Sequence, residues 1–553
     1  MSRPTDTPSE SLKIEDLLEL PTSRLEELAI QLQELEEQFL QIRYEQSKYR
    51  ALISPFYKLP IEILQEIFIA CLPTAHNHLM SRWEPPILLT QICSSWRNVA
   101  HATPQLWKSI HIARPYRRLP GSPHYFLNFL STTIEHDPRL EAVVEWLTRS
   151  AAYPLDISVG HSISNDDDWF YYRTIDSLIQ FSEKWREIRL SAPYEALLPI
   201  ASLPLSKVPL LEALSLKCHV NFIELDPQWI SSGVVNAPNL RDLGLWSTFR
   251  NPDIVQLPIN WSQLTNISLE DLPGSLSIKR AYKLLSLCRN LITCRLHIGN
   301  FTDYNERLET NAAPISLPFL TRLSVREEFA TAASRLFTLL HLPSLKCIEF
   351  HSTVQRTEQS STSLLSLLTR SHNTIQLITD ARSYTRQDFI KCLRLCPLLK
   401  SLHFREPYRW ENPLDIPPFK VDDAFVKLFF QPSNDEGYLC PHLEDFECSV
   451  DTTFCETTLL LFVKEKNGDS TTSTGLAKLK HLFIAFNGVP HSDIKQELEP
   501  YEQAGLVASL TYGLTSAPRS TFGGLPGFSR AGLFLKSASL ITLESFWPPA
   551  IFY

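Results

Sequence analysis

A short apolar motif recurs along most of this chain, and its spacing restricts the fold more than any other feature. The motif reads Leu-x-x-Leu-x-Leu, as at Leu211, Leu214 and Leu216, with other apolar residues as substitutes. Between positions 185 and 345 the first residues of successive motifs lie 26, 29, 24, 27, 29 and 25 residues apart. A period of this length indicates a repeat architecture, in which each copy is one supersecondary unit. The motifs begin at Trp185, Leu211, Leu240, Leu264, Leu291, Leu320, Leu345, His372, Leu399, Leu443 and Leu479.

The spacing inside each motif predicts a short strand. Its last two apolar residues lie two positions apart, so both point to the same side of an extended chain. Helix-like runs separate the motifs, for example over 281–287, 335–340 and 389–395. One strand with one helix cannot bury its own apolar face, whereas stacked units share a continuous core with the strands on the concave side. The predicted fold class is therefore an α/β solenoid, with loops inserted where the steps after position 399 lengthen to 44 and 36 residues.

This region resembles the leucine-rich repeats. That family's strict form places asparagine or cysteine three positions after the last leucine, and this chain departs from it. The departure leaves the stacking at these places, and the regularity of the arc, open. The residues found there are His219, Thr248, Leu272 and Glu328.

The segment before the repeats predicts three short amphipathic helices. Pro60 suits the first position of a helix, where its missing N–H is not needed. Leu64, Ile67, Phe68 and Cys71 then follow at helical spacing. A second helix is expected over 89–100 and a third short piece from position 104. So small a core is marginal by itself and gains stability from a partner. Periodicity alone leaves a second interpretation open, that these are core helices of a larger domain.

The order of residues here resembles the F-box, in the version common in fungal proteins. Leu-Pro at position 59, Ile-Leu-x-x-Ile-Phe at 63, Cys-x-x-Trp-Arg-x-Val-Ala at 93 and Pro-x-Leu-Trp at 104 carry the resemblance. It implies docking on a Skp-type adaptor, which a cullin holds in turn, with Trp96 in the core of the bundle. The implied adaptor contacts are Leu59, Pro60, Ile63, Leu64, Ile67 and Phe68.

A further helix is expected before this segment. Ser23 and Glu26 have the capping-box spacing. Apolar residues then step by three and four from Leu25 to Ile42, with a weaker continuation to Ile53, which is a heptad seam. Self-association through 25–53 as a short coiled coil and packing of the stripe on its own chain both remain open.

Composition excludes several classes of function. The formal net charge of −9 gives no general affinity for nucleic acid or anionic lipid. The polar start of the chain is not a signal peptide, and no run of about eighteen apolar residues predicts a membrane span. The 11 cysteines include no Cys-x-x-Cys pair, so they are interpreted as small buried residues in a reducing compartment. We expect a cytoplasmic or nuclear location.

No catalytic constellation is recognisable. Phosphate-cradling, zinc-protease and nucleophile-elbow motifs are absent from the sequence. His76 and His78 lack carboxylate or thiolate neighbours, and 166–168 is an acidic run without calcium-site spacing. No cofactor or metal is expected. The array offers a surface instead, because residues beside the apolar strand positions point away from the core. The candidate target-binding residues are Lys217, Trp246, Glu270, Arg295, His297, Arg326, His351, His403 and Arg405.

These observations predict a non-catalytic protein that joins two others. The resemblance implies a substrate-recognition subunit of an SCF-type ubiquitin ligase, with the repeats holding an unidentified protein target. A repeat scaffold outside any ligase is the alternative, and a hydrolase or transferase on another α/β fold is a third. The expected regions are a disordered tail at 1–20, a coiled-coil helix at 21–56, the F-box at 57–112, a connecting region with irregular first repeats at 113–184, the solenoid at 185–510 and a loose segment or cap at 511–553.

Overall fold

The computed structural model describes most of the chain in two compact units. One comprises Met1–Cys71 with Leu89–Thr103, and the other comprises Leu72–Leu88 with Pro104–Tyr553. The described residues are 24, 27–46, 59–113, 138–160, 169–218, 227–246, 254–270, 276–299, 312–327, 332–352, 363–371, 373–380, 384–405, 419–432, 437–449, 452–468, 475–487 and 493–513. The four positions at which the strict repeat pattern fails, and most of the expected tail and C-terminal segment, lie outside them.

The first unit is helical. It contains a helix over 27–46, α2 (Ile61–Ala70), most of α3 (Ile87–Ile92) and α4 (Ser94–His101). Pro60 is the N-cap of α2 rather than its first residue. The helices therefore occur where periodicity predicts them. The apolar stripe of the 27–46 helix is exposed, with exposed fractions from 46% to 65% for Leu28, Leu32, Leu35, Phe39 and Ile42.

The second unit is a solenoid built on one parallel sheet of 14 strands, with the strands in sequence order apart from the short β8 and β10. Each repeat contributes one strand, because its two inward apolar residues fill the layer between the sheet and the helices. The strands are β1 (Ser109–Ile112), β2 (Leu155–Val159), β3 (Trp185–Ala192), β4 (Ala213–Cys218), β5 (Asp242–Trp246), β6 (Asn266–Glu270), β7 (Thr293–Ile298), β9 (Arg322–Glu327), β11 (Cys347–Ser352), β12 (Gln376–Thr379), β13 (Ser401–Phe404), β14 (Asp445–Cys448), β15 (His481–Asn487) and β16 (Val507–Gly513).

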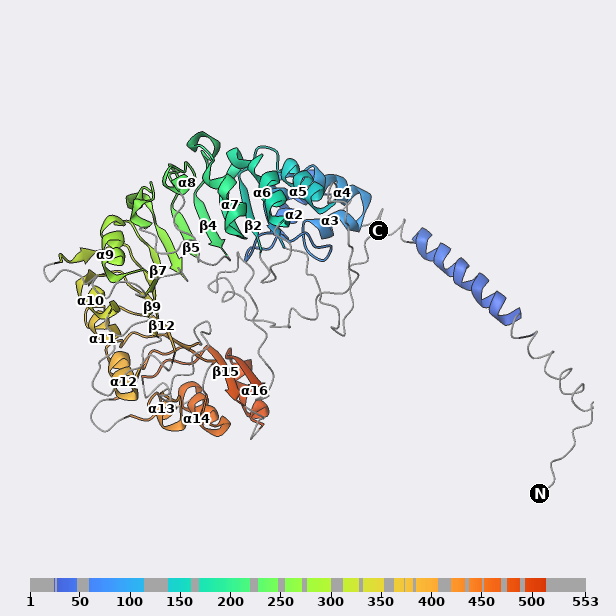
Figure 1. The fold of residues 1–553 in the computed structure, drawn as a ribbon. Helices are drawn as coiled ribbons and strands as arrows, with labels where there is room; N and C mark the ends of the chain where they lie inside the picture. The colour runs from blue at the N-terminus through green and yellow to red at the C-terminus, as the bar shows by residue number, and fades with distance from the viewer. Residues whose placement is uncertain are drawn as a thin grey trace, which may run out of the picture. The chain divides into compact units, whose positions relative to one another are not determined.

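Helices return the chain from one strand to the next. They lie on the outer side of the array, and the strands line its inner side (Figure 1). A separate two-stranded sheet joins β8 (Ile315–Ser316) to β10 (Leu340–His341). The helices are α5 (Pro138–Arg149), α6 (Trp169–Ile179), α7 (Tyr194–Ala201), α8 (Pro227–Ile230), α9 (Ile278–Leu287), α10 (Ala332–Leu339), α11 (Ser363–Leu368), α12 (Arg386–Arg394), α13 (Asp423–Lys427), α14 (Glu456–Asn467) and α16 (Lys495–Gln503), and the 3₁₀ turns are η2 (Pro104–Trp107), η3 (Ser182–Lys184), η4 (Leu205–Lys207), η5 (Ile254–Gln256) and η6 (Trp261–Gln263).

The core follows the repeat register. Leu214 and Leu216 of β4 are buried and pair with Leu243 and Leu245 of β5. Aromatic rings replace leucine in the later repeats, so that the core there is a chain of phenylalanine contacts. Its members, with neighbouring ring centroids 5.4 to 6.3 Å apart, include Phe389, Phe404, Phe425, Phe429, Phe446 and Phe462.

The segment Leu72–Leu88 covers the first edge of the sheet. Leu79 forms a parallel bridge with His111 of β1, and the His111 N–H donates a 2.7 Å hydrogen bond to the carbonyl of His78. Asn77 adds side-chain bonds to Ser109 and Ser158, each 3.0 Å long. The loop between the first two predicted F-box helices is therefore part of the solenoid unit.

The strand predictions are confirmed from β3 to β15, including the degenerate copy that forms β12. Two strands were not predicted. β1 follows Trp107, which the sequence reading placed at the end of the F-box, although Trp107, Ile110 and Ile112 have the motif spacing. β16 continues the array past position 510, and its motif is hidden because Gly505 and Ala508 stand where leucine is usual.

Candidate protein-interaction surfaces

The exposed face of α2 is the first candidate surface. Ile61 and Ile63 are 59% and 47% exposed, whereas Leu64 and Phe68 are 6% and 0% exposed. The helix therefore has one face in the core of its unit and one apolar face in solvent. Among the six implied adaptor contacts, Pro60 and Ile63 are exposed, Leu59 and Ile67 are half-buried, and Leu64 and Phe68 are buried.

Sequence reasoning missed Ile61 as a contact, although its position directly after the N-cap is a signal. Ile92 of α3 is a further exposed apolar side chain, at 54%. Phe68 instead contacts Trp96 of α4, with ring centroids 4.9 Å apart. The buried members thus hold the bundle together, and the exposed members remain available to a partner.

The inner face of the sheet is the second candidate surface. Lys217, Trp246 and Glu270 occupy one register row on β4, β5 and β6. His297, Arg326 and His351 occupy another on β7, β9 and β11. The sequence prediction thus placed these residues in rows correctly. It did not anticipate that four of the nine are buried, namely His297, His351, His403 and Arg405, at 3% to 7% exposed.

A charge network explains part of this burial. Arg295 lies 3.2 Å from a carboxylate oxygen of Glu270 and 3.3 Å from one of Glu349. His351 Nδ1 lies 2.9 Å from Asp380, and its Nε2 lies 3.5 Å from Glu349. Three strands therefore exchange charges along the inner face. Asp380 was not predicted, and its position next to β12, in line with His351, is the signal that sequence reasoning overlooked.

The pKa values follow from these contacts. Burial acts to lower the pKa of His351, but hydrogen bonds and charge from Asp380 and Glu349 outweigh it and raise that pKa to about 9. Burial acts to raise the pKa of Glu349, but His351 and Arg295 lower it to about 2. The histidine is therefore a cation held between two carboxylates at neutral pH.

A second charge group lies on β13 and β14. Arg405 donates to Glu447 from Nε at 2.8 Å and from Nη2 at 2.6 Å, a bidentate pair. Burial, followed by the Arg405 charge, lowers the pKa of His403 to about 4. These side chains satisfy one another, so their charges are committed to the sheet. Lys217 has neither an ion pair nor a hydrogen bond within the described part of the chain.

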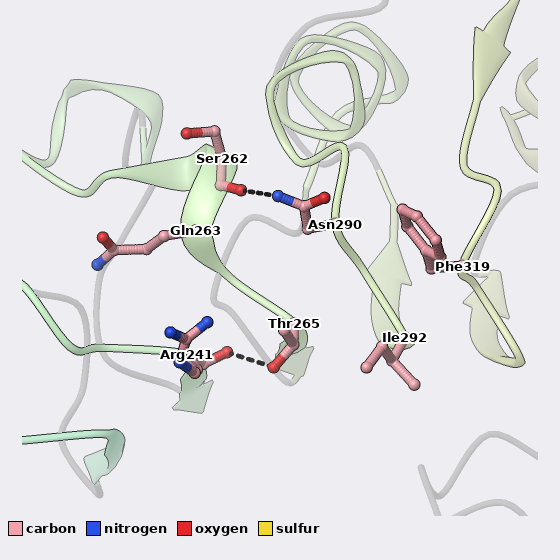
Figure 2. A pocket seen from close by; sticks show the side chains of 7 residues that line it. All are labelled: Arg241, Ser262, Gln263, Thr265, Asn290, Ile292 and Phe319. Atoms are coloured by element: carbon pink, nitrogen blue, oxygen red, sulfur yellow. Dashed lines mark hydrogen bonds between the residues drawn. The ribbon is translucent and has the colours of Figure 1, made fainter.

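A hollow of about 500 Å³ opens at the edge where the strands begin. Figure 2 shows Asn290 donating to the Ser262 carbonyl, at 2.8 Å, and Thr265 donating to the Arg241 carbonyl, at 3.2 Å. These bonds join neighbouring repeats. Its lining was not predicted, because it comes from positions between the motif's apolar residues. The lining residues are Arg241, Ser262, Gln263, Thr265, Asn290, Ile292 and Phe319.

The described residues contain no group of three or more His, Cys, Asp or Glu side chains that suits a metal ion. His78 and His111 are buried, and burial lowers the pKa of each to about 4. All 11 cysteines are free, and burial raises the pKa of the Cys218 thiol to about 12. The acidic run at 166–168 lies outside the described residues. No helix of the described part is long and apolar enough to cross a membrane.

Comparison with known proteins gives two distant likenesses. Neither a family model nor a curated protein matches the chain. The structure of the Rad7 and Elc1 complex in yeast is similar over 58% of this chain and 84% of that chain, at 16% identity and a TM-score of 0.33. The structure of the TLR13–ssRNA13 complex is similar over 68% of this chain and 48% of that chain, at 15% identity and a TM-score of 0.28. At such scores the function rests on the residues of this chain alone.

Proposed function

We propose that this chain is the substrate-recognition subunit of an SCF-type ubiquitin ligase, active in the cytoplasm or nucleus. The exposed apolar face of α2 docks on a Skp-type adaptor, which a cullin holds, and the inner face of the sheet holds a target protein. The observation that carries the proposal is the division of α2. Leu64 and Phe68 secure the helix, while Ile61 and Ile63 stay in solvent although isoleucine is usually buried.

The proposed role needs no catalytic residue from this chain. A ligase subunit of this kind holds a target lysine close to a charged conjugating enzyme, which raises the local concentration of the two reactants. The inner face suits such a role because it is rigid, being tied by paired strands and internal ion pairs. The edge hollow contains a single ionisable side chain, Arg241, and does not favour a hydrolase or transferase.

Affinity capture with mass spectrometry tests the proposal. The wild-type chain is expected to recover a Skp-type adaptor and a cullin. The double variant Ile61→Asp/Ile63→Asp is expected to lose both, because charges at an apolar interface are desolvated without a partner. Glu62→Ala, on the same turn and already exposed, is the matched control and is expected to retain them.

Two results would contradict the ligase proposal. One is a wild-type capture that contains neither adaptor nor cullin, which favours a scaffold that binds partners through the same repeats. The other is undiminished recovery by the double variant, which would place the adaptor contact elsewhere. Circular dichroism on each variant separates lost binding from lost folding.

A further inference from the structure

Trp246 lies directly on the backbone of Gly244 on the inner face of β5. A Cβ atom added to Gly244 would be 2.4 Å from Cζ3 and 2.6 Å from Cη2 of the indole, distances that real Cβ contacts do not reach. The ring therefore occupies the space that any side chain at position 244 would fill. Glycine weakens a strand interior, so its presence there is explained by this close approach.

The neighbouring strands leave room around the ring. Gly244 pairs with Ser215 of β4 and with Ser268 of β6, so three adjacent strands carry small residues in one row. The Ser215 hydroxyl oxygen lies 3.2 Å from the position of the added Cβ. The floor is thus shallow, and the indole is supported from below while its side chain remains half-buried rather than covered.

The charges beside the ring are unequal. Lys217 and Glu270 flank Trp246 in the next register row. Glu270 accepts a 2.9 Å hydrogen bond from Ser268 and lies 3.2 Å from Arg295, so its charge is compensated. Lys217 has no such partner among the described residues. One uncompensated positive charge therefore stands beside a supported aromatic ring.

We propose that Trp246 and Lys217 form the anchor site for an extended target peptide in which an acidic residue neighbours an aromatic residue or proline. The flat side chain packs on the indole, and the carboxylate pairs with Lys217. Tryptophan is enriched among residues that dominate binding energy, because it buries a large area at little entropic expense. A basic residue fits poorly, since Lys217 repels it and Arg295 already neutralises Glu270. This inference rests on the proposed role of the inner face and names the target chemistry.

Selection from a random peptide library on phage, with the full chain immobilised, tests the inference. We expect wild type to enrich peptides with an acidic residue beside an aromatic residue or proline. Trp246→Ala should weaken the best peptide at least about tenfold. Lys217→Glu should shift the selected peptides from acidic to basic. Gly244→Ala should weaken binding as well, because the added methyl group displaces the indole.

Trp83→Ala is the matched control, because Trp83 is 59% exposed and lies in the Leu72–Leu88 segment, and it should bind like wild type. Selection of peptides without acidic residues, or binding that survives both Trp246→Ala and Lys217→Glu in folded protein, would overturn the inference. Adaptor capture is measured separately. Trp246-dependent selection without adaptor recovery would support the anchor site and contradict the ligase proposal.

Discussion

Phe68 of α2 and Trp96 of α4 lie with their ring centroids 4.9 Å apart and their planes inclined at 50°. Phe68 is completely buried, and Trp96 is half-buried. This contact joins two helices of a unit whose core is small. The stability of the unit therefore depends heavily on a single aromatic pair.

Phe68→Ala is expected to destabilise this unit by about 3 to 5 kcal/mol, because the deletion removes apolar contacts and leaves a cavity. Hydrogen exchange of the α2 amides should accelerate, while amides of β4 to β7 stay protected. Ile63→Ala, which truncates an exposed side chain, is the control and should change exchange little. Unchanged α2 protection in Phe68→Ala would contradict the assigned role.

The pair between Arg405 and Glu447 predicts strong non-additivity. Glu447→Leu alone leaves a buried guanidinium without its partner, and we expect a loss of about 3 to 5 kcal/mol. Adding Arg405→Met should restore much of that stability, because no unpaired charge then remains. A double-mutant cycle in urea measures the coupling, and additive single losses would show that the pair is not formed in solution.

His78 and His111 predict loss of stability in acid. Burial lowers both folded-state pKa values from 6.5 to about 4, so the unfolded chain takes up protons first. Their contribution is complete above pH 6.5 and is lost as pH falls towards 4, by roughly 2 to 3 kcal/mol for each residue. His78→Gln should flatten the pH profile of unfolding over this range, and an unaltered profile would contradict the prediction.

His351 predicts the opposite behaviour in alkali. Its folded-state pKa is raised from 6.5 to about 9, so it contributes stability fully below pH 6.5 and loses it as pH rises through 9. His351→Gln should be destabilised at pH 6, and the difference from wild type should shrink by pH 10. A difference that is constant across this range would exclude titration of His351 as the cause.

The exposed stripe of the 27–46 helix predicts self-association through residues 25–53. Leu32 and Leu35 are 59% and 65% exposed, and the heptad spacing suits a two-stranded coiled coil. Light scattering should show a concentration-dependent dimer for wild type and a monomer for Leu32→Lys/Leu35→Lys. Glu34→Lys, on another face of the same helix, is the control. A monomeric wild type at high concentration would leave the stripe without this role.

The sequence predicted the repeat unit because leucine, isoleucine and valine at fixed spacing determine which side of each strand is buried. It located the strand at Gln376–Thr379 from the period even though His372 replaces the usual leucine. It failed at Gly505 and Ala508, where small residues occupy apolar positions and hydrogen bonding to β15 alone defines the strand.

The inner face was predicted only in part. Register gave the rows in which Lys217, Trp246 and Glu270 lie side by side. Which charges neutralise one another depends on distances between side chains from strands about 25 to 55 residues apart, such as Arg295 and Glu349, and no local pattern encodes them. The support of Trp246 by Gly244 was also invisible, because an isolated glycine in a strand has several explanations.

The bond between His78 and His111 gives the array a direction of growth. Repeat proteins evolve by duplicating units, and a new unit needs a strand with unoccupied pairing groups on which to stack. At β1 the segment Leu72–Leu88 already occupies that position, so a unit inserted there would have to displace it and break the connection to α2. Lengthening of this protein over evolutionary time is therefore expected between internal repeats or beyond β16, and shortening from the β1 end would remove the helical head with it.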